Sequence, residues 1–125
     1  MDRLDIATGA EFEAYARRHL STAWGVDLRP GRVLVGGKVE KSFDLVGADG
    51  RIVGDAKWYK NLRTPAAKWS TIAEYVWLLQ RVDAERAFLV FGQDAAVPER
   101  FLDRFRALVD PVEFYFLDAS GHRRL

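Results

Sequence analysis

The spacing of apolar residues along the chain alternates between a helical period and the alternation typical of strands. From residue 9 to about residue 24, apolar side chains recur every three or four positions, which predicts an amphipathic helix. Thr8 and Glu11 form a capping-box pattern at its start, since a threonine precedes a glutamate by three positions. The same period predicts two further helices, one from Thr64-Pro65 and one from Pro98.

Short runs of β-branched and aromatic residues between these helices predict five strands. Their approximate ranges are 32–35, 41–48, 51–59, 87–91 and 112–117. Arg29-Pro30-Gly31 is expected to be a turn, and residues 121–125 a basic tail. The order αβββαβαβ predicts an α/β fold with one mixed sheet flanked by helices, and the whole of 1–125 is expected to form one domain.

The segment around Asp49-Gly50 carries the candidate chemistry. This dipeptide favours a tight hairpin turn, and a two-residue loop there places Asp44 directly opposite Asp55. Lys57 then lies on the same face, because side chains alternate along a strand. Opposed like charges destabilise a sheet unless a proton or a cation lies between them. A hard cation with oxygen ligands, Mg²⁺ above all, fits this arrangement.

The two faces of this hairpin are expected to have different roles. Tyr59 follows Lys57 on the face that carries the two aspartates, so it is a candidate functional residue. Phe43, Leu45 and Trp58 share the other face and are expected to pack inside the protein.

Composition removes several classes of function. The chain has 125 residues and no cysteine, which excludes disulfides and thiolate zinc sites and agrees with a cytoplasmic location. No apolar segment is long enough to predict a membrane span, and no signal peptide is expected. The net charge of +1 gives little indication of a polyanionic partner, so that inference rests on local clusters. His19 and His122 are not expected to form a metal or relay site.

The hairpin motif resembles the core signature of the PD-(D/E)xK nuclease superfamily, which has the restriction-endonuclease-like fold. Asp44 and Asp55-Ala56-Lys57 carry this resemblance, with Phe43 in place of the proline and Asp55 in place of the commoner glutamate or glutamine. Gly9-Ala-Glu-Phe-Glu13 is similar to the G-x-x-F-E helix of Mrr-like restriction endonucleases, and Lys57-Trp-Tyr-Lys60 to their K-x-Y-K segment. The order of elements matches over nearly the whole chain.

The resemblance implies a metal-dependent nuclease that cleaves DNA more readily than RNA. Asp44, Asp55, the carbonyl of Ala56 and Glu13 would hold Mg²⁺, for which Mn²⁺ can substitute. Lys57 would position the attacking water and stabilise developing negative charge. Holliday-junction resolvases of this fold are dimers, which suggests a homodimer, and a protein partner is a second source of specificity. The expected nucleic-acid-binding residues are Tyr59, Lys60, Arg63 and Lys68.

Two other interpretations remain open at this point. One is a catalytically inactive nucleic-acid-binding or interaction module on the same fold. The other is a structural α/β domain in which Lys57 and neighbouring arginines pair with Asp44 and Asp55. Two measurements distinguish the nuclease, the inactive module and the structural domain. They are stabilisation of the protein by metal and cleavage of nucleic acid.

Overall fold

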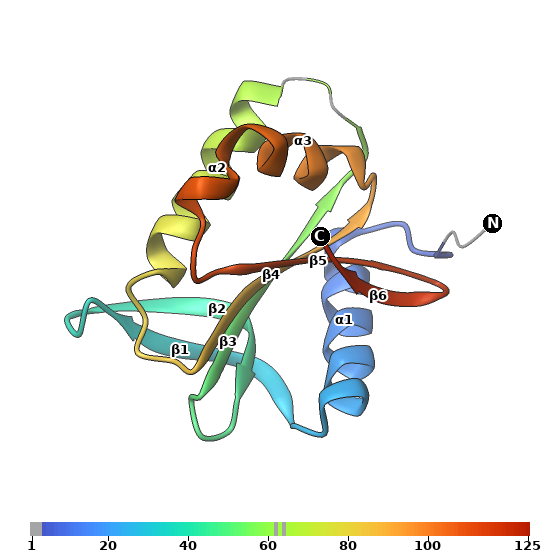
Figure 1. Ribbon diagram of the computed structural model, residues 1–125. Helices are drawn as coiled ribbons and strands as arrows, with labels where there is room; N and C mark the ends of the chain where they lie inside the picture. Colours follow the sequence, from blue (N-terminus) through green and yellow to red (C-terminus); the bar gives the residue numbers. More distant parts are fainter. Residues whose placement is uncertain (1–3, 62, 64) are drawn as a thin grey trace.

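The computed structural model describes residues 4–61, 63 and 65–125, which form a six-stranded mixed sheet with helices on both of its faces (Figure 1). The helices are α1 (Gly9–Trp24), α2 (Pro65–Leu79) and α3 (Ala96–Phe105), which continues into the short 3₁₀ helix η1 (Arg106–Leu108). The strands are β1 (Leu28–Val35), β2 (Val39–Gly47), β3 (Ile52–Tyr59), β4 (Arg86–Gln93), β5 (Glu113–Asp118) and β6 (Gly121–Arg124).

The strands lie in the sheet in the same order as in the chain. β1, β2 and β3 form an antiparallel meander, and β4 pairs in parallel with both β3 and β5. The predicted α/β class and mixed sheet are therefore confirmed. The parallel pairs occur where a helix connects the strands, because such a crossover returns the chain to the same end of the sheet.

The predicted order αβββαβαβ lacks one strand. Residues 121–124 are not a tail but form β6, which pairs antiparallel with β5 and covers its outer edge. A short turn makes this possible, since the carboxylate of Asp118 accepts hydrogen bonds from the backbone and hydroxyl of Ser120. The pattern gave no sign of this strand because its sequence, Gly-His-Arg-Arg, does not alternate apolar and polar residues.

The predicted end signals of α1 are confirmed. Thr8 Oγ1 accepts a hydrogen bond from the backbone N–H of Glu11, and Gly25 ends the helix with a left-handed φ of 66°. Thr64 lies outside the described residues, and α2 begins at Pro65. α3 begins at Ala96, two residues before the predicted Pro98, which lies in its first turn. No helix in the described part of the chain is long and apolar enough to cross a membrane.

Two hydrophobic clusters hold the helices against the sheet. On one face, α1 contributes Phe12, Ala16 and Leu20 to a cluster with β-strand residues. On the other face, α2 and α3 pack on a second cluster. β4 contributes to both clusters, because its consecutive buried residues alternate between the two faces of the sheet. Its members divide into Ala87, Leu89 and Phe91 on the α2 face and Phe88 and Val90 on the α1 face.

A bulge between β1 and β2 changes the predicted facing of residues. Arg29 pairs with Val46 and Gly31 with Phe43, so the segment 44–45 of β2 lies opposite Pro30 alone. Arg29-Pro30-Gly31 is therefore part of β1 rather than a turn, in an edge strand where proline is tolerated. The extra residue in β2 reverses the side-chain alternation.

As a result, the expectation that Phe43 and Leu45 share one core face is wrong. Phe43 packs in the cluster under α2, whereas Leu45 packs in the cluster under α1. Trp58 does pack inside as expected, and its ring stacks on Phe12 with ring centroids 4.9 Å apart. The bulge thus places Asp44 between two residues that are anchored on opposite faces of the sheet.

We expect Gly54→Ala to destabilise the protein, because β3 passes close to Phe88 at this position. A Cβ atom on Gly54 would lie 2.3 Å from the Phe88 ring, and this buried ring is itself packed against Trp24. The expected loss in the free energy of unfolding is about 1–3 kcal/mol, measured by urea denaturation. Gly47→Ala is the matched control, since its Cβ would meet no atom closer than 3.6 Å. Equal midpoints for the two variants would contradict this packing.

Candidate active site

The candidate site lies where β2 and β3 diverge. The two strands pair at Leu45 with Gly54 and at Val46 with Val53, which is the predicted register. The connecting loop spans 48–51, longer than the expected two residues, and Gly50 in it has a left-handed φ of 73°. Beyond these pairs β2 turns away from β3 and leaves a fork that opens toward α2 (Figure 1).

Asp44 and Asp55 bridge the two strands at the base of this fork. Asp55 Oδ1 accepts a hydrogen bond from the backbone N–H of Asp44 at 2.9 Å. Asp44 Oδ2 accepts one from the backbone N–H of Ala56 at 3.1 Å. The two carboxylates thus accept the hydrogen bonds that backbone carbonyls would accept if β2 and β3 stayed paired here. Asp44 and Asp55 lie opposite each other, as the predicted register requires.

Lys57 lies on the same side of β3 as Asp55. Its ammonium nitrogen is 2.9 Å from Asp55 Oδ2, and the side chains of Lys57 and Asp55 are only 11% and 6% exposed. A second group covers the ammonium, since Lys57 Nζ lies 3.2 Å from the ring centroid of Tyr75 on α2. The predicted grouping of Asp44, Asp55 and Lys57 therefore exists in the structure.

α1 brings Glu13 and Arg17 to the other side of the fork. They are four positions apart and so lie on one face of the helix. Arg17 Nη1 donates to the carbonyl oxygen of Asp44 at 3.4 Å. Burial raises the pKa of Glu13, the charge of Asp44 adds to the rise, and Arg17 and Lys57 oppose it. Glu13 is therefore close enough to Asp44 to interact with its charge.

The acidic pair has the electrostatics of a site that favours a cation. Burial raises the pKa of Asp55 to about 7, the nearby ammonium of Lys57 opposes the rise, and the charge of Asp44 adds to it. Two ionised carboxylates at this position are thus only partly compensated by Lys57. A bound divalent cation would supply the missing positive charge.

The two aspartate carboxylates are suitable ligands for a hard cation such as Mg²⁺, which needs few ligands from the protein. Among residues 4–61, 63 and 65–125, no three side chains of His, Cys, Asp or Glu converge to hold a metal. The two aspartates do converge, and Oδ1 of Asp44 accepts no hydrogen bond from any described residue. Mg²⁺ commonly uses one or two carboxylates and completes its octahedron with water and substrate oxygens.

The four residues expected to bind nucleic acid lie in different settings. The Tyr59 ring packs near Phe91, and its hydroxyl is buried without a hydrogen-bond partner in the described part of the chain. Burial, together with Tyr75 and Asp55, raises the pKa of Tyr59 to about 12. Lys60 and Arg63 are exposed just beyond β3, and Lys68 Nζ donates to the carbonyl oxygen of Arg63. A role for these four residues in binding stays a prediction.

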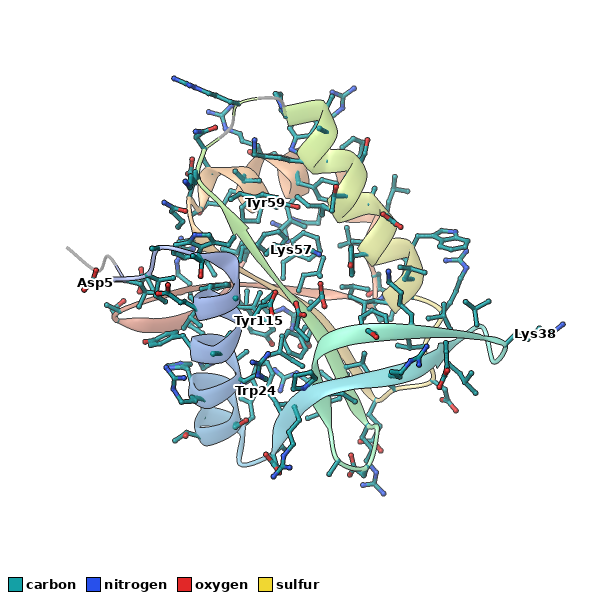
Figure 2. All side chains as sticks on the ribbon, turned by 180° about the vertical axis from the view of Figure 1, so that it is seen from behind. Asp5, Trp24, Lys38, Lys57, Tyr59 and Tyr115 are labelled. Carbon is teal, nitrogen blue, oxygen red and sulfur yellow. The ribbon has the colours of Figure 1, made fainter. Side chains whose placement is uncertain are left out.

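Figure 2 shows the position of the site relative to the rest of the chain. Lys57 and Tyr59 follow one another along β3, flanked in this view by α1 and α2. Lys38 lies at the tip of the β1–β2 hairpin, well away from Lys57. Lys38 is therefore not part of the site.

Tyr75 is a residue at the site that was not expected from the sequence. The spacing of Tyr75, three positions after the buried Ile72 on α2, could have indicated a residue at the margin of the helix–sheet contact. Away from the site, His19 Nε2 and His122 Nδ1 lie 3.0 Å apart and share a hydrogen bond that links α1 to β6. The sequence pattern does not indicate that these histidines are close, because it does not predict β6.

Comparisons of the chain with protein-family models, with curated proteins and with solved structures gave no match. The geometry of the site and the order of the elements are thus the basis for any assignment.

Proposed function

We propose that this protein is a metal-dependent nuclease that hydrolyses phosphodiester bonds, with DNA as the preferred substrate. The observation that carries the proposal is the meeting of Asp44, Asp55 and the Lys57 ammonium in one fork of the sheet. On this proposal, the elements from α1 to β5 correspond to the restriction-endonuclease-like core, and β6 is an addition at its edge.

Each group in the fork has a role in this chemistry. Asp44 and Asp55 would hold Mg²⁺ together with the carbonyl of Ala56, and Glu13 would support the ion or its water ligands. The ion, when bound, supplies polarisation of the scissile phosphate and a lowered pKa for a bound water. Lys57 places a fixed positive charge beside the phosphate, where negative charge increases in the transition state.

Positive charge around the fork supports binding of a polyanion. Arg17 reaches it from α1, and Lys41 Nζ lies 5.5 Å from the ring of Tyr75 on the α2 side. Such side chains would contact backbone phosphates, which position nucleic acid without reading its sequence. A homodimer or a specificity-conferring partner would then be needed for selection of a site or a branched structure.

One observation favours the second candidate, an inactive nucleic-acid-binding module. In the described part of the chain no three metal-ligating side chains converge, and both oxygens of Asp55 already accept hydrogen bonds. If no metal binds, the fork presents a salt-bridged acidic pair, and binding would depend on the surrounding basic side chains.

Incubation with different nucleic acids in the presence of Mn²⁺ or Mg²⁺ tests the proposal. The substrates are plasmid, single-stranded DNA, branched DNA and RNA, each with an EDTA control. We expect metal-dependent cleavage of at least one DNA substrate, detected by gel electrophoresis. Shifted mobility without cleavage supports the binding module, whereas neither binding nor cleavage by a folded protein contradicts both.

A further inference from the structure

Tyr75 covers the Lys57 ammonium from the side of the fork opposite α1. The distance of 3.2 Å from Nζ to the ring centroid places the cation directly against the aromatic face. The ring is itself supported by an edge contact with Phe43, with centroids 6.4 Å apart and planes at 79°. α2 and β2 therefore fix the ring that lies over the lysine.

This contact restricts a side chain that is otherwise mobile. Lysine has four rotatable side-chain bonds and loses considerable rotamer entropy when it is held in place. The ion pair with Asp55 Oδ2 restricts the position of Lys57 Nζ from one side, and the ring of Tyr75 restricts it from a second side. An aromatic face attracts a cation without neutralising its charge as a carboxylate does. The N–H donors of the ammonium that Asp55 does not take therefore remain for another anion.

We propose that Tyr75 is a positioning residue, which holds the Lys57 ammonium at the fork so that it faces the scissile phosphate. The inference rests on the proposed nuclease function and adds a residue that neither the hairpin motif nor the resemblance to known nucleases identified. Its ring, rather than its hydroxyl, performs this role, because the ring makes the contact with Nζ.

Variants that separate the ring from the hydroxyl test the inference. Tyr75→Phe keeps the aromatic face and is expected to keep kcat within about threefold of wild type. Tyr75→Leu removes the face and is expected to lower kcat about tenfold, with KM changed less than about twofold. Trp77→Leu is the matched control, an aromatic residue of the same helix that is 54% exposed, and it should leave both constants unchanged.

A spectroscopic measurement tests the same contact without cleavage. In EDTA, the ε-methylene protons of Lys57, assigned by their loss in Lys57→Met, should be shifted upfield by the ring current in wild type and in Tyr75→Phe. They should return to ordinary lysine positions in Tyr75→Leu. Ordinary positions in the folded wild type would overturn the inference, whatever the variants do. Thermal melting shows whether Tyr75→Leu is folded, and Tyr75→Met replaces it if not.

The outcomes separate this inference from the proposed function. If the wild type cleaves no substrate, the nuclease proposal fails and the role of Tyr75 fails with it. If the wild type cleaves and folded Tyr75→Leu keeps its kcat, only the role of Tyr75 is wrong. Equal losses of kcat in Tyr75→Phe and Tyr75→Leu would also overturn it, because the hydroxyl would then be the active group.

Discussion

Replacement of Lys57 by methionine is expected to reduce the rate of metal-dependent cleavage by at least about 100-fold. Lys57 is the cation closest to the acidic pair, and removal of one preorganised charge that stabilises a transition state commonly has an effect of this size. Methionine keeps the aliphatic packing of the side chain. The measurement is single-turnover cleavage of the best DNA substrate at saturating Mn²⁺.

The same variant should also be less stable than wild type, in a way that depends on pH. Loss of Lys57 leaves a buried Asp55 carboxylate without its cation, which costs about 3 kcal/mol when the group is ionised. Because Lys57 opposes the raised pKa of Asp55, its removal raises that pKa further. The loss of stability should therefore be largest above pH 7 and disappear near pH 4, where the carboxyl is protonated in both proteins.

Lys38→Met is the control for Lys57→Met, because it removes the same charge at the distant tip of the β1–β2 hairpin. It should keep the cleavage rate within about twofold. Undiminished cleavage by Lys57→Met would point to a contaminating nuclease, and a stability loss independent of pH would contradict the assigned ion pair.

Asp44→Asn is expected to have two opposite effects on thermal stability. With EDTA at pH 8, the variant should be more stable than wild type by up to about 1 kcal/mol, because it removes a like charge opposite Asp55. The asparagine carbonyl can still accept the hydrogen bond from the Ala56 N–H. With excess Mg²⁺ or Mn²⁺ the order should reverse, since only wild type gains stability from the bound ion.

The pH dependence of the first effect follows from the raised pKa of Asp55. Above about pH 7 Asp55 is ionised in the folded protein and repels Asp44, whereas well below pH 7 Asp55 is protonated and this repulsion is lost. The stability gain of Asp44→Asn in EDTA should therefore grow as the pH rises from 4 to 8. A metal-induced rise in Tm of equal size in both proteins would rule out Asp44 as a ligand.

The local features of the fold and site could be predicted because short segments of sequence determine them. The capping residues of α1 act within one turn of the helix, and Asp49-Gly50 sets the reversal that brings Asp44 opposite Asp55. The alternation along β3 then places Lys57 beside Asp55. None of these steps requires knowledge of distant parts of the chain.

The features that were missed depend on contacts between distant segments. β6 is stabilised by pairing with β5 and has no pattern of its own, and without it the proximity of His19 and His122 was not evident. The contact of Tyr75 with Lys57 depends on how α2 lies across the sheet, which helical spacing alone does not specify. Long-range packing determined each of these positions.

The bulge in β2 has a consequence for attempts to alter this protein by directed evolution. Phe43 and Leu45 anchor the strand in separate clusters, so the backbone of Asp44 is held from both sides of the sheet. Insertion or deletion of one residue between Phe43 and Val46 would remove or move this bulge, and the position of Asp44 would change with it. Libraries that vary chain length in this hairpin should therefore be depleted of functional members, even when every residue of the fork is retained.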